Sequence, residues 1–484
     1  MQEQNTTFTM PDFLPALPEM FLLGAACVVL LADLFFPGRN RGLTWLLSLV
    51  ALAGTAVCVL ALEVGEHGVM TFSNTFVLDQ LAILMKLAVL AASATVLVYS
   101  RHYLAARDLH RGEFYTLTLF STLGMLVIIS APHLLTLYLG LELMSLCLYA
   151  LVALNRDSAV GAEAAMKYFV LGAIASGLLL YGMSIIYGVT GSLQLDEIAA
   201  FMGAQEERHL GLILALTFVV AGLAFKLGAV PFHMWLPDVY HGAPTPVTLL
   251  IGSAPKIAAF ALVFRLLVEG MEHLYVDWRD IFILMSVLSL VAGSVVAIAQ
   301  TNIKRMLAYS TIGHIGFLLM GFIAGTSEGY SAALFYALVY VLMALGAFGM
   351  ILLLSRKDFE ADNLDDFRGL NARSPWFALV MLLVMFSMAG VPPTIGFHAK
   401  LAVLSAVVNA GFLWLAVLGV IAAIVSAFYY LRVVKLMYFD EPQDNAPLSG
   451  GIDMRILLSA NGIAVLVLGL MPGALLTATI AAIP

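Results

Sequence analysis

Charged residues are scarce in this sequence. Only 11% of its 484 residues are Asp, Glu, Lys or Arg, whereas 62% are hydrophobic. Soluble domains are about 25% charged, because a surface that faces water needs charge. The shortage excludes a soluble particle of this length and indicates a membrane protein.

Cysteine is almost as scarce. Cys27, Cys58 and Cys147 lie far apart, each inside an apolar run, and no pair has the spacing of a zinc site or an iron–sulfur cluster. The sequence also lacks a phosphate-binding glycine loop, a dinucleotide fingerprint and the basic patch of a nucleic-acid-binding protein. We therefore expect no metal, cofactor or nucleic acid on this chain, and neither ATP hydrolysis nor electron transfer by it.

Long apolar runs are abundant. A helix needs about 20 apolar residues to cross roughly 30 Å of hydrocarbon. Fourteen segments approach or exceed that length: residues 13–36, 43–62, 76–99, 114–130, 133–153, 158–188, 210–236, 244–268, 280–299, 303–324, 329–354, 375–408, 411–438 and 455–477. We predict an all-α, polytopic membrane protein of 14 transmembrane helices, numbered in this order.

The basic residues fix the predicted sidedness of the loops. Alternate loops lie on opposite sides of the membrane and so form two sets. One set holds only Arg208 and Arg279. The other set, with its helix ends, holds fifteen basic residues: Arg39, Arg41, Arg101, Arg107, Arg111, Arg156, Lys304, Arg305, Arg356, Lys357, Arg368, Arg373, Arg432, Lys435 and Arg455. Because cytoplasmic loops are enriched in Lys and Arg, both termini are predicted to face away from the cytoplasm.

Two predicted helices contain helix breakers at corresponding places. They are Gly228-Ala-Val-Pro-Phe-His233 in helix 7 and Gly390-Val-Pro-Pro-Thr-Ile-Gly-Phe-His398 in helix 12. An offset of five helices reverses the direction of crossing, which fits two inverted five-helix repeats, helices 4–8 and 9–13, as in ion-coupled transporters. Two unrelated proline kinks are the alternative. The predicted division is residues 1–113, 114–268 (first repeat), 280–438 (second repeat) and 455–484.

Each break should leave backbone carbonyls without a helical partner. Pro231 releases the carbonyl of Leu227, while Pro392 and Pro393 release those of Met388 and Ala389, because proline has no N–H to donate four residues back. In hydrocarbon such carbonyls need water or a protein donor. Both breaks are therefore predicted to be wet or to contact a polar side chain.

Five ionisable residues lie deep in the predicted spans: Glu142, Lys167, Lys226, Lys256 and Lys400. On insertion scales each costs roughly 2.5 to 3.5 kcal/mol at mid-membrane, so each needs an explanation. Glu142 lies 13 residues before Asn155 and Lys167 lies 12 residues after it. A hairpin at Asn155 would place the two at equal depth, which predicts an ion pair between helices 5 and 6. A purely structural lock is the alternative.

The other three lysines have no acid at helical spacing. Because burial disfavours a charged amine, Lys226, Lys256 and Lys400 must be neutral part of the time or contact water, and each could relay protons. Two unit charges about 4 Å apart interact by roughly 4 kcal/mol at an effective dielectric of 20. Driving a proton against roughly 200 mV costs about 4.6 kcal/mol. The energy of one internal ion pair is therefore similar to the energy needed to move one proton across the membrane.

Several further polar residues in or near the spans allow more than one interpretation. His314 and His398 are either hydrogen-bonded core residues or members of a proton path. Lys304 is either an anchor at the cytoplasmic surface or a member of that path. Arg265 is predicted to be an anchor at the membrane–water interface. Asp79 lies near a helix end, where capping or contact with water would suffice, whereas Lys86 could snorkel, pair with an acid of a neighbouring helix or take part in function.

The segment from Lys226 to Thr248, KLGAVPFHMWLPDVYHGAPTPVT, resembles the antiporter-like subunits of respiratory complex I, most closely the subunit N family. Further matches are LGLELMS at 139–145, EAAMKY at 163–168, SAPKIA at 253–258, QTNIKRMLAYS at 300–310 and GVPPTIGF at 390–397. They run from helix 5 to helix 12. The resemblance implies that Glu142 and Lys167 form the family's ion pair, and that Lys226 belongs to the first half-channel. It likewise implies that Lys256 is the connecting lysine and Lys400 the last basic residue of the second half-channel.

The same resemblance implies a proton-translocating subunit of NADH:quinone oxidoreductase in the bacterial inner membrane, with both termini periplasmic. NADH, FMN, iron–sulfur clusters and quinone would then bind other subunits, and the partners would be the other membrane subunits, the peripheral redox arm and the lipid bilayer. An Mrp-type cation/proton antiporter subunit and a structural membrane subunit remain alternatives.

Overall fold

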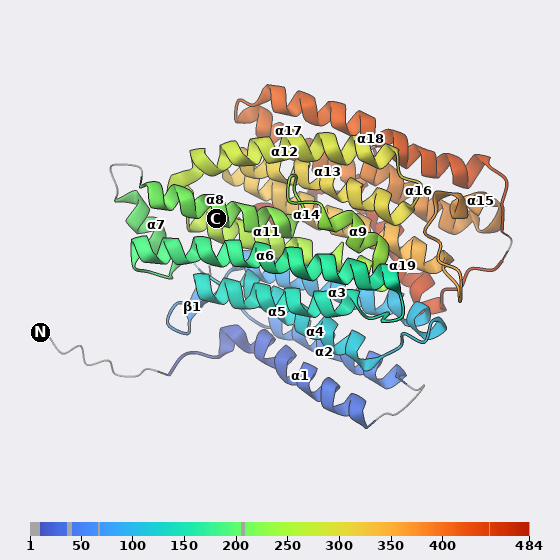
Figure 1. The fold of residues 1–484 in the computed structure, drawn as a ribbon, viewed down its shortest axis with the longest axis horizontal. Coiled ribbons are helices and arrows are strands. Elements are labelled where there is room, and N and C mark those ends of the chain that lie inside the picture. The colour runs from blue at the N-terminus through green and yellow to red at the C-terminus, as the bar shows by residue number, and fades with distance from the viewer. Residues whose placement is uncertain (1–9, 36–40, 66–67, 205–208, 445, 484) are drawn as a thin grey trace, which may run out of the picture.

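The chain forms an elongated bundle of helices that run side by side (Figure 1). The structure, a computed structural model, describes residues 10–35, 41–65, 68–204, 209–444 and 446–483. Within these ranges, thirteen helices are long and apolar enough to cross a membrane. The predicted helical membrane class is confirmed. Arg39 and Arg208, which entered the sidedness prediction, lie outside the described residues.

The helices follow the predicted apolar runs. In the first half of the chain they are α1 (Leu17–Leu34, preceded by the short η1, Leu14–Ala16), α2 (Gly42–Leu60), α3 (Gln80–Ala106), α4 (Gly112–Ile129), α5 (Leu134–Val152), α6 (Ala159–Thr190), α7 (Leu195–Gly203), α8 (Leu210–Leu227), α9 (Trp235–Gly242), α10 (Thr245–Ile251), α11 (Ala254–Val263) and the π-helix η2 (Phe264–Glu269).

In the second half they are η3 (Glu272–Leu274), α12 (Tyr275–Ile298), α13 (Ile303–Ile323), α14 (Ser327–Leu354), η4 (Leu364–Phe367), α15 (Leu370–Arg373), α16 (Pro375–Ala389), α17 (Ile395–Asn409), α18 (Leu413–Phe439), α19 (Ile452–Leu470) and α20 (Gly473–Ala482). The predicted helix 7 is divided into α8 and α9, and helix 12 into α16 and α17. Helix 14 also ends early, since Pro472 separates α19 from α20.

The prediction for the start of helix 3 is wrong. Residues from 76 onward form strand β2 (Phe76–Leu78), which pairs antiparallel with β1 (Val69–Thr71). The helix begins only after Asp79, whose side chain accepts a hydrogen bond from the amide of Ala82 at 2.7 Å. Apolar content alone does not separate a β-branched strand from the first turn of a helix, whereas the N-cap acid marks the boundary.

Helix 8 is interrupted as well, although it was predicted to be continuous. The interruption falls at Gly252 and Ser253, between α10 and α11. Pro255 lies in the first turn of α11, where its missing N–H is tolerated, and this favours a new helix start at that point. Lys256 follows directly, so the interruption places this lysine in a first helical turn rather than in mid-helix.

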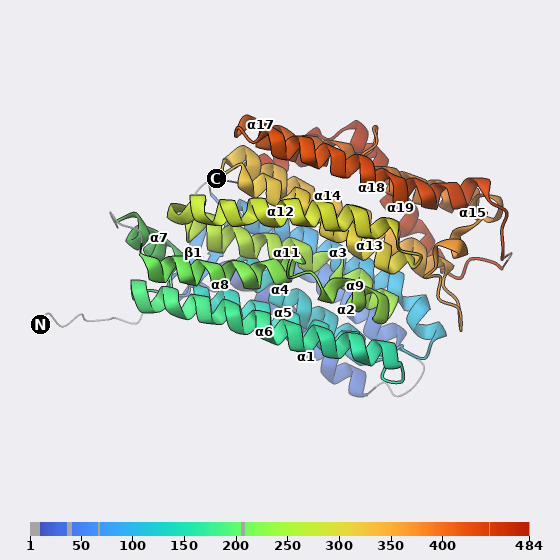
Figure 2. The ribbon, with the colours of Figure 1, turned by 45° about the horizontal axis from the view of Figure 1, so that its top comes forward.

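α13 and α14 form the centre of the bundle, where nearly every residue is buried. α14 packs against α3, α11, α13, α16 and α17. α1 and α18 lie at opposite edges in both views (Figure 1, Figure 2). One end of the bundle gathers α7 and β1, and the other gathers α15 with the loops that hold most of the basic residues. At that second end Arg107 pairs with Glu360 and Arg356 pairs with Asp444.

Candidate functional site

The break between α8 and α9 is stabilised by a lysine from a neighbouring helix. α8 ends at Leu227, and Gly228 then adopts a left-handed conformation, with φ +84°, that glycine reaches without strain. The ammonium of Lys256 in α11 donates to the Leu227 carbonyl at 2.8 Å. The carbonyl predicted to be released by Pro231 therefore has a protein partner, and that partner is a candidate site residue that is 4% exposed.

The break between α16 and α17 has the same local geometry. α16 ends at Ala389, and Gly390 adopts φ +86°. The ammonium of Lys400 donates to the carbonyls of Met388 and Ala389 at 3.0 and 2.8 Å, which are the two carbonyls that the prolines were predicted to release. Lys256 and Lys400 thus each hold the open end of a broken helix.

Lys226 has a different kind of environment. It lies in the last turn of α8, and its ammonium donates to the hydroxyl of Ser145 at 2.8 Å and to that of Tyr149 at 3.4 Å, both in α5. Lys226 and Lys256 line one cavity of about 20 Å³. A cavity needs roughly 10 to 15 Å³ to hold a water molecule, so there is room for one water between these lysines.

The predicted ion pair between Glu142 and Lys167 is not formed. Lys167 instead pairs with Glu163, one turn earlier in α6, at 2.9 Å and with Asp238 in α9 at 2.6 Å. Glu142 interacts electrostatically with Lys226, and one of its carboxylate oxygens is buried with no hydrogen bond to the described residues. Equal depth in two adjacent helices does not determine how each helix is rotated about its own axis. The rotation of α6 points Lys167 toward α9.

Asp238 is a residue that the sequence reasoning missed. It lies in α9, outside the candidate membrane spans, and its two oxygens bind Lys167 at 2.6 Å and Arg305 of α13 at 2.8 Å. Burial alone would raise the pKa of Asp238, but the hydrogen bonds from Lys167 and Arg305 hold it below its ordinary value. Glu163, in contrast, could have been found, because its spacing from Lys167 is that of an i, i+4 helical pair.

His314 is buried in the second half of the bundle. Its Nδ1 contacts the Tyr336 hydroxyl at 2.6 Å and its Nε2 contacts the Tyr430 hydroxyl at 3.1 Å. A small cavity joins His314 to Lys256, and the charge of Lys400 acts on the imidazole. His314 therefore shares a cavity with Lys256 and is close enough to Lys400 to interact with its charge.

His398 lies elsewhere, although it is only two residues from Lys400. Its Nε2 meets the carbonyl of Gly469 in α19 at 3.0 Å. This contact fits the reading of His398 as a hydrogen-bonded packing residue between α17 and α19.

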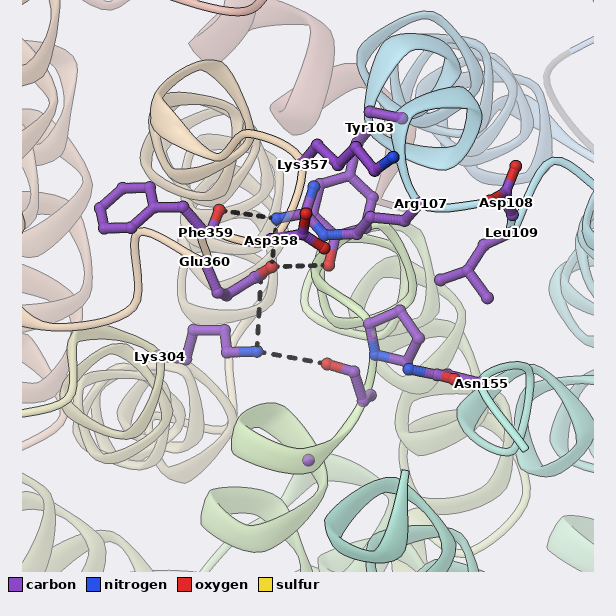
Figure 3. A pocket seen from close by; sticks show the side chains of 14 residues that line it. Tyr103, Arg107, Asp108, Leu109, Asn155, Lys304, Lys357, Asp358, Phe359 and Glu360 are labelled. Carbon is purple, nitrogen blue, oxygen red and sulfur yellow. Dashed lines mark hydrogen bonds and ion pairs between the residues drawn. The ribbon is translucent and has the colours of Figure 1, made fainter. Parts of the chain in front are cut away.

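Lys304 is buried, 4% exposed, at the start of α13, so its side chain is not the surface anchor that was one of its two readings. It lines a cavity of about 450 Å³ at the basic end of the bundle, which we call the Glu360 pocket (Figure 3). The pocket is lined by Tyr103, Ala106, Arg107, Asp108, Leu109, Asn155, Gly242, Ala243, Pro244, Lys304, Lys357, Asp358, Phe359 and Glu360. Glu360 could not be predicted from a sequence pattern, because it lies in an irregular loop.

Two further buried cations are paired. Lys86 in α3 meets Glu19 in α1 at 2.7 Å, with side-chain exposures of 0% and 7%, which selects the pairing alternative for this lysine. Arg265, predicted to be an interface anchor, is instead buried between Asp79 at 2.6 Å and Glu269 at 2.5 Å. Asp79 therefore both caps α3 and neutralises Arg265.

The chain was also compared with known families. Residues 131–426 match the family model described as "NADH:quinone oxidoreductase/Mrp antiporter, TM". NADH-quinone oxidoreductase subunit N of Thioalkalivibrio sulfidiphilus (strain HL-EbGR7) is 60% identical over 478 residues, which are 99% of each chain.

Solved structures are similar too. A chain of respiratory complex I from Thermus thermophilus with bound aureothin is 32% identical, with a TM-score of 0.81, over 96% of this chain and 100% of that one. A chain of the Mrp complex from Dietzia sp. DQ12-45-1b shares the fold, with 22% identity and a TM-score of 0.80, over 97% of this chain and 96% of that one.

Proposed function

Because the chain belongs to the NADH-quinone oxidoreductase subunit N family, we propose that it moves protons through the line of buried residues described above. Family members are proton-translocating membrane subunits of an oxidoreductase complex, and this chain has that function. The Mrp-type alternative is less well supported, since the Mrp relative shares the fold at 22% identity against 60% for the subunit N relative.

The observation that carries the proposal is the continuity of the buried polar groups. Lys226 and Lys256 share a cavity with room for one water, and Lys256 and His314 share a second, smaller cavity. The charge of Lys400 reaches His314. A proton or a charge displacement would thus pass from Lys226 to His314 by way of the two cavities that Lys256 shares with them, and from there to Lys400. Glu142, beside Lys226, is the acid at the first end of this line of residues. Lys167 lies outside the line and is connected to α9 through its ion pair with Asp238.

The proposal also includes the number of membrane spans, their division into repeats and their orientation. The two halves of helix 12 would together supply the fourteenth span, and residues 114–268 and 280–438 would be inverted repeats flanked by residues 1–113 and 455–484. The matching glycine conformations and lysine-bound carbonyls at the two breaks support this arrangement. We place the chain in the bacterial inner membrane with its basic end in the cytoplasm and both termini periplasmic. NADH, FMN, iron–sulfur clusters and quinone would bind in partner subunits of the complex.

The proposal is tested by replacing Lys226 in the assembled complex. Lys226→Met cannot carry a proton, and Lys226→Arg stays protonated and cannot cycle. We expect both variants to assemble normally while NADH-driven proton uptake into inverted membrane vesicles, read by a quenched pH dye, falls to near background. Proton pumping by Lys226→Met at the wild-type rate and stoichiometry would remove Lys226 from the mechanism.

A further inference from the structure

One carboxylate joins three parts of the chain at the basic end of the bundle. Glu360 extends from the loop between α14 and η4. Its Oε2 accepts from the hydroxyl of Tyr103 in α3 at 2.8 Å and from Arg107, directly after α3, at 2.9 Å. Its Oε1 accepts from the hydroxyl of Thr245 at the start of α10. On the same side it faces the ammonium of Lys304 at 4.0 Å (Figure 3).

Glu360 is therefore divided between two cations. Arg107 lies within hydrogen-bond distance, whereas Lys304 is close enough to attract the carboxylate but too far to hydrogen-bond to it. The only hydrogen bond recorded for the ammonium of Lys304 within the described residues is a long one, 3.3 Å, to the carbonyl of Ala243. Lys304 is thus a buried amine whose charged form is stabilised only from a distance, by Glu360 and Asp362, while Glu360 itself is held mainly by Arg107.

The helix that carries Lys304 leads inward to the relay. Thr311 and His314 follow Lys304 by seven and ten residues in α13, so they lie near one face of the helix. The hydroxyl of Thr311 contacts that of Tyr340 at 2.7 Å. Tyr340 and His314 line the small cavity that also contains Lys256. One face of α13 therefore runs from the Glu360 pocket to the middle of the bundle.

We propose that the Glu360 pocket is a site of proton uptake for this relay, and that Glu360 gates it by exchanging its carboxylate between Arg107 and Lys304. This inference rests on the proposed function and adds a positioning residue to it. A proton from pocket water binds neutral Lys304, and Glu360 leaves Arg107 to pair with the new ammonium. When that proton passes along α13 toward His314, Lys304 is neutral again and Glu360 returns to Arg107.

Two replacements of Glu360 separate charge from shape. Glu360→Gln keeps the length of the side chain. Its carbonyl oxygen can still accept from Tyr103, and its amide NH2 can donate to the Thr245 hydroxyl, but it has no charge. Glu360→Asp keeps the charge and shortens the reach. In the assembled complex we expect pumping to fall at least about tenfold in the Gln variant. Such a fall corresponds to a loss of one pKa unit in the proton affinity of Lys304, which lowers the protonated fraction of Lys304 about tenfold. Pumping should fall less in the Asp variant. Asp365→Asn, which removes an exposed charge from the helix η4 that follows this loop, should pump like wild type.

The structural alternative, in which Glu360 only ties the loop to α3, predicts the reverse order, because Gln preserves the hydrogen bonds better than Asp. Pumping by Glu360→Gln equal to or better than that of Glu360→Asp would overturn the gating proposal. Arg107→Gln provides a second test that leaves Glu360 in place. With Arg107 absent, Glu360 should remain on Lys304, so pumping should fall, and wild-type pumping would overturn the exchange.

The proposed function is tested separately within the same experiment. If Glu360→Gln pumps normally while Lys226→Met does not, the gate is wrong and the relay stands. If Lys226→Met also pumps normally, the relay itself is wrong.

Discussion

Replacing the three relay lysines by methionine should have unequal effects on stability. Among the described residues, Lys226 donates to hydroxyl groups alone, and the Ser145 hydroxyl already donates to the carbonyl of Leu141 at 2.6 Å. Lys226→Met therefore leaves no backbone group without a partner. Lys256→Met removes the donor of one carbonyl and Lys400→Met removes the donor of two.

The size of the difference follows from the number of carbonyls that lose their donor. A buried polar group without a partner costs about 1 to 3 kcal/mol. We therefore expect Lys256→Met to be less stable than Lys226→Met by about 1 to 3 kcal/mol, and Lys400→Met by about 2 to 6 kcal/mol. All three variants also lose the cost of burying an ammonium. In Lys226→Met this gain is set against the loss of the positive charge beside Glu142, so the variant should stay close to or above wild type, and the ranking of the variants is the sharper observable.

The assay is the thermal unfolding of the purified complex, followed in parallel with NADH-driven proton pumping. Lys400→Gln is the matched control, because its amide can still donate to the released carbonyls although it cannot cycle a proton. It should recover part of the melting temperature lost in Lys400→Met and none of the pumping. Equal melting temperatures for the three Met variants would refute the reasoning, since water would then be replacing the lysines at both breaks.

The remaining predictions concern the acids and the buried pair. Glu142→Gln should severely impair NADH-driven pumping in an assembled complex and Glu142→Asp should impair it less; equal losses together with failed assembly would favour a structural lock. Lys86→Met should lower the melting temperature, because an unpaired buried Glu19 carboxylate costs about 3 to 5 kcal/mol, while the double variant with Glu19→Gln should recover it; no recovery would contradict the pairing. Asp238, whose pKa is lowered, stabilises its contacts above its unfolded pKa of about 3.9, and this contribution is lost only as pH falls through the lower folded value. Asp238→Asn should therefore scale the rate of pumping by one factor throughout pH 5 to 9, and a changed profile would contradict a permanently ionised Asp238.

Much of the fold could be predicted from the sequence because hydrocarbon imposes a local rule. Apolar length defines a span, and proline and glycine define its breaks, since a missing N–H and a left-handed φ act on the backbone of the same segment. The carbonyls of Leu227, Met388 and Ala389 could be identified in this way before any contact was known. Which lysine would reach them could not, because Lys256 is distant in sequence from Leu227 and the contact depends on tertiary packing.

The failed ion pair has the same origin. Depth along the membrane normal can be counted from a hairpin, but the direction in which a side chain leaves its helix depends on how the helix is rotated against its neighbours. The hairpin at Asn155 predicts equal depth for Glu142 and Lys167, yet α6 directs Lys167 to Asp238 in α9. Glu360 could not be predicted for a different reason. In the sequence, a charged residue in an irregular loop looks like any solvated residue, and only the fold places it beside Arg107 and Lys304.

The two kinds of lysine environment assign different tasks to residues that look alike in the sequence. Lys256 and Lys400 each hold carbonyls that have no helical donor, so moving either ammonium exposes a backbone group at a helix break. Lys226 holds hydroxyl groups, which rotate and can find other partners, and it lies beside Glu142. Motion is therefore least costly at Lys226, where the charge of one acid can attract or release the ammonium. In the proposed relay, a shift of Lys226 would change the charge next to the cavity that it shares with Lys256. The carbonyl-bound lysines would then respond by gaining or losing a proton rather than by moving.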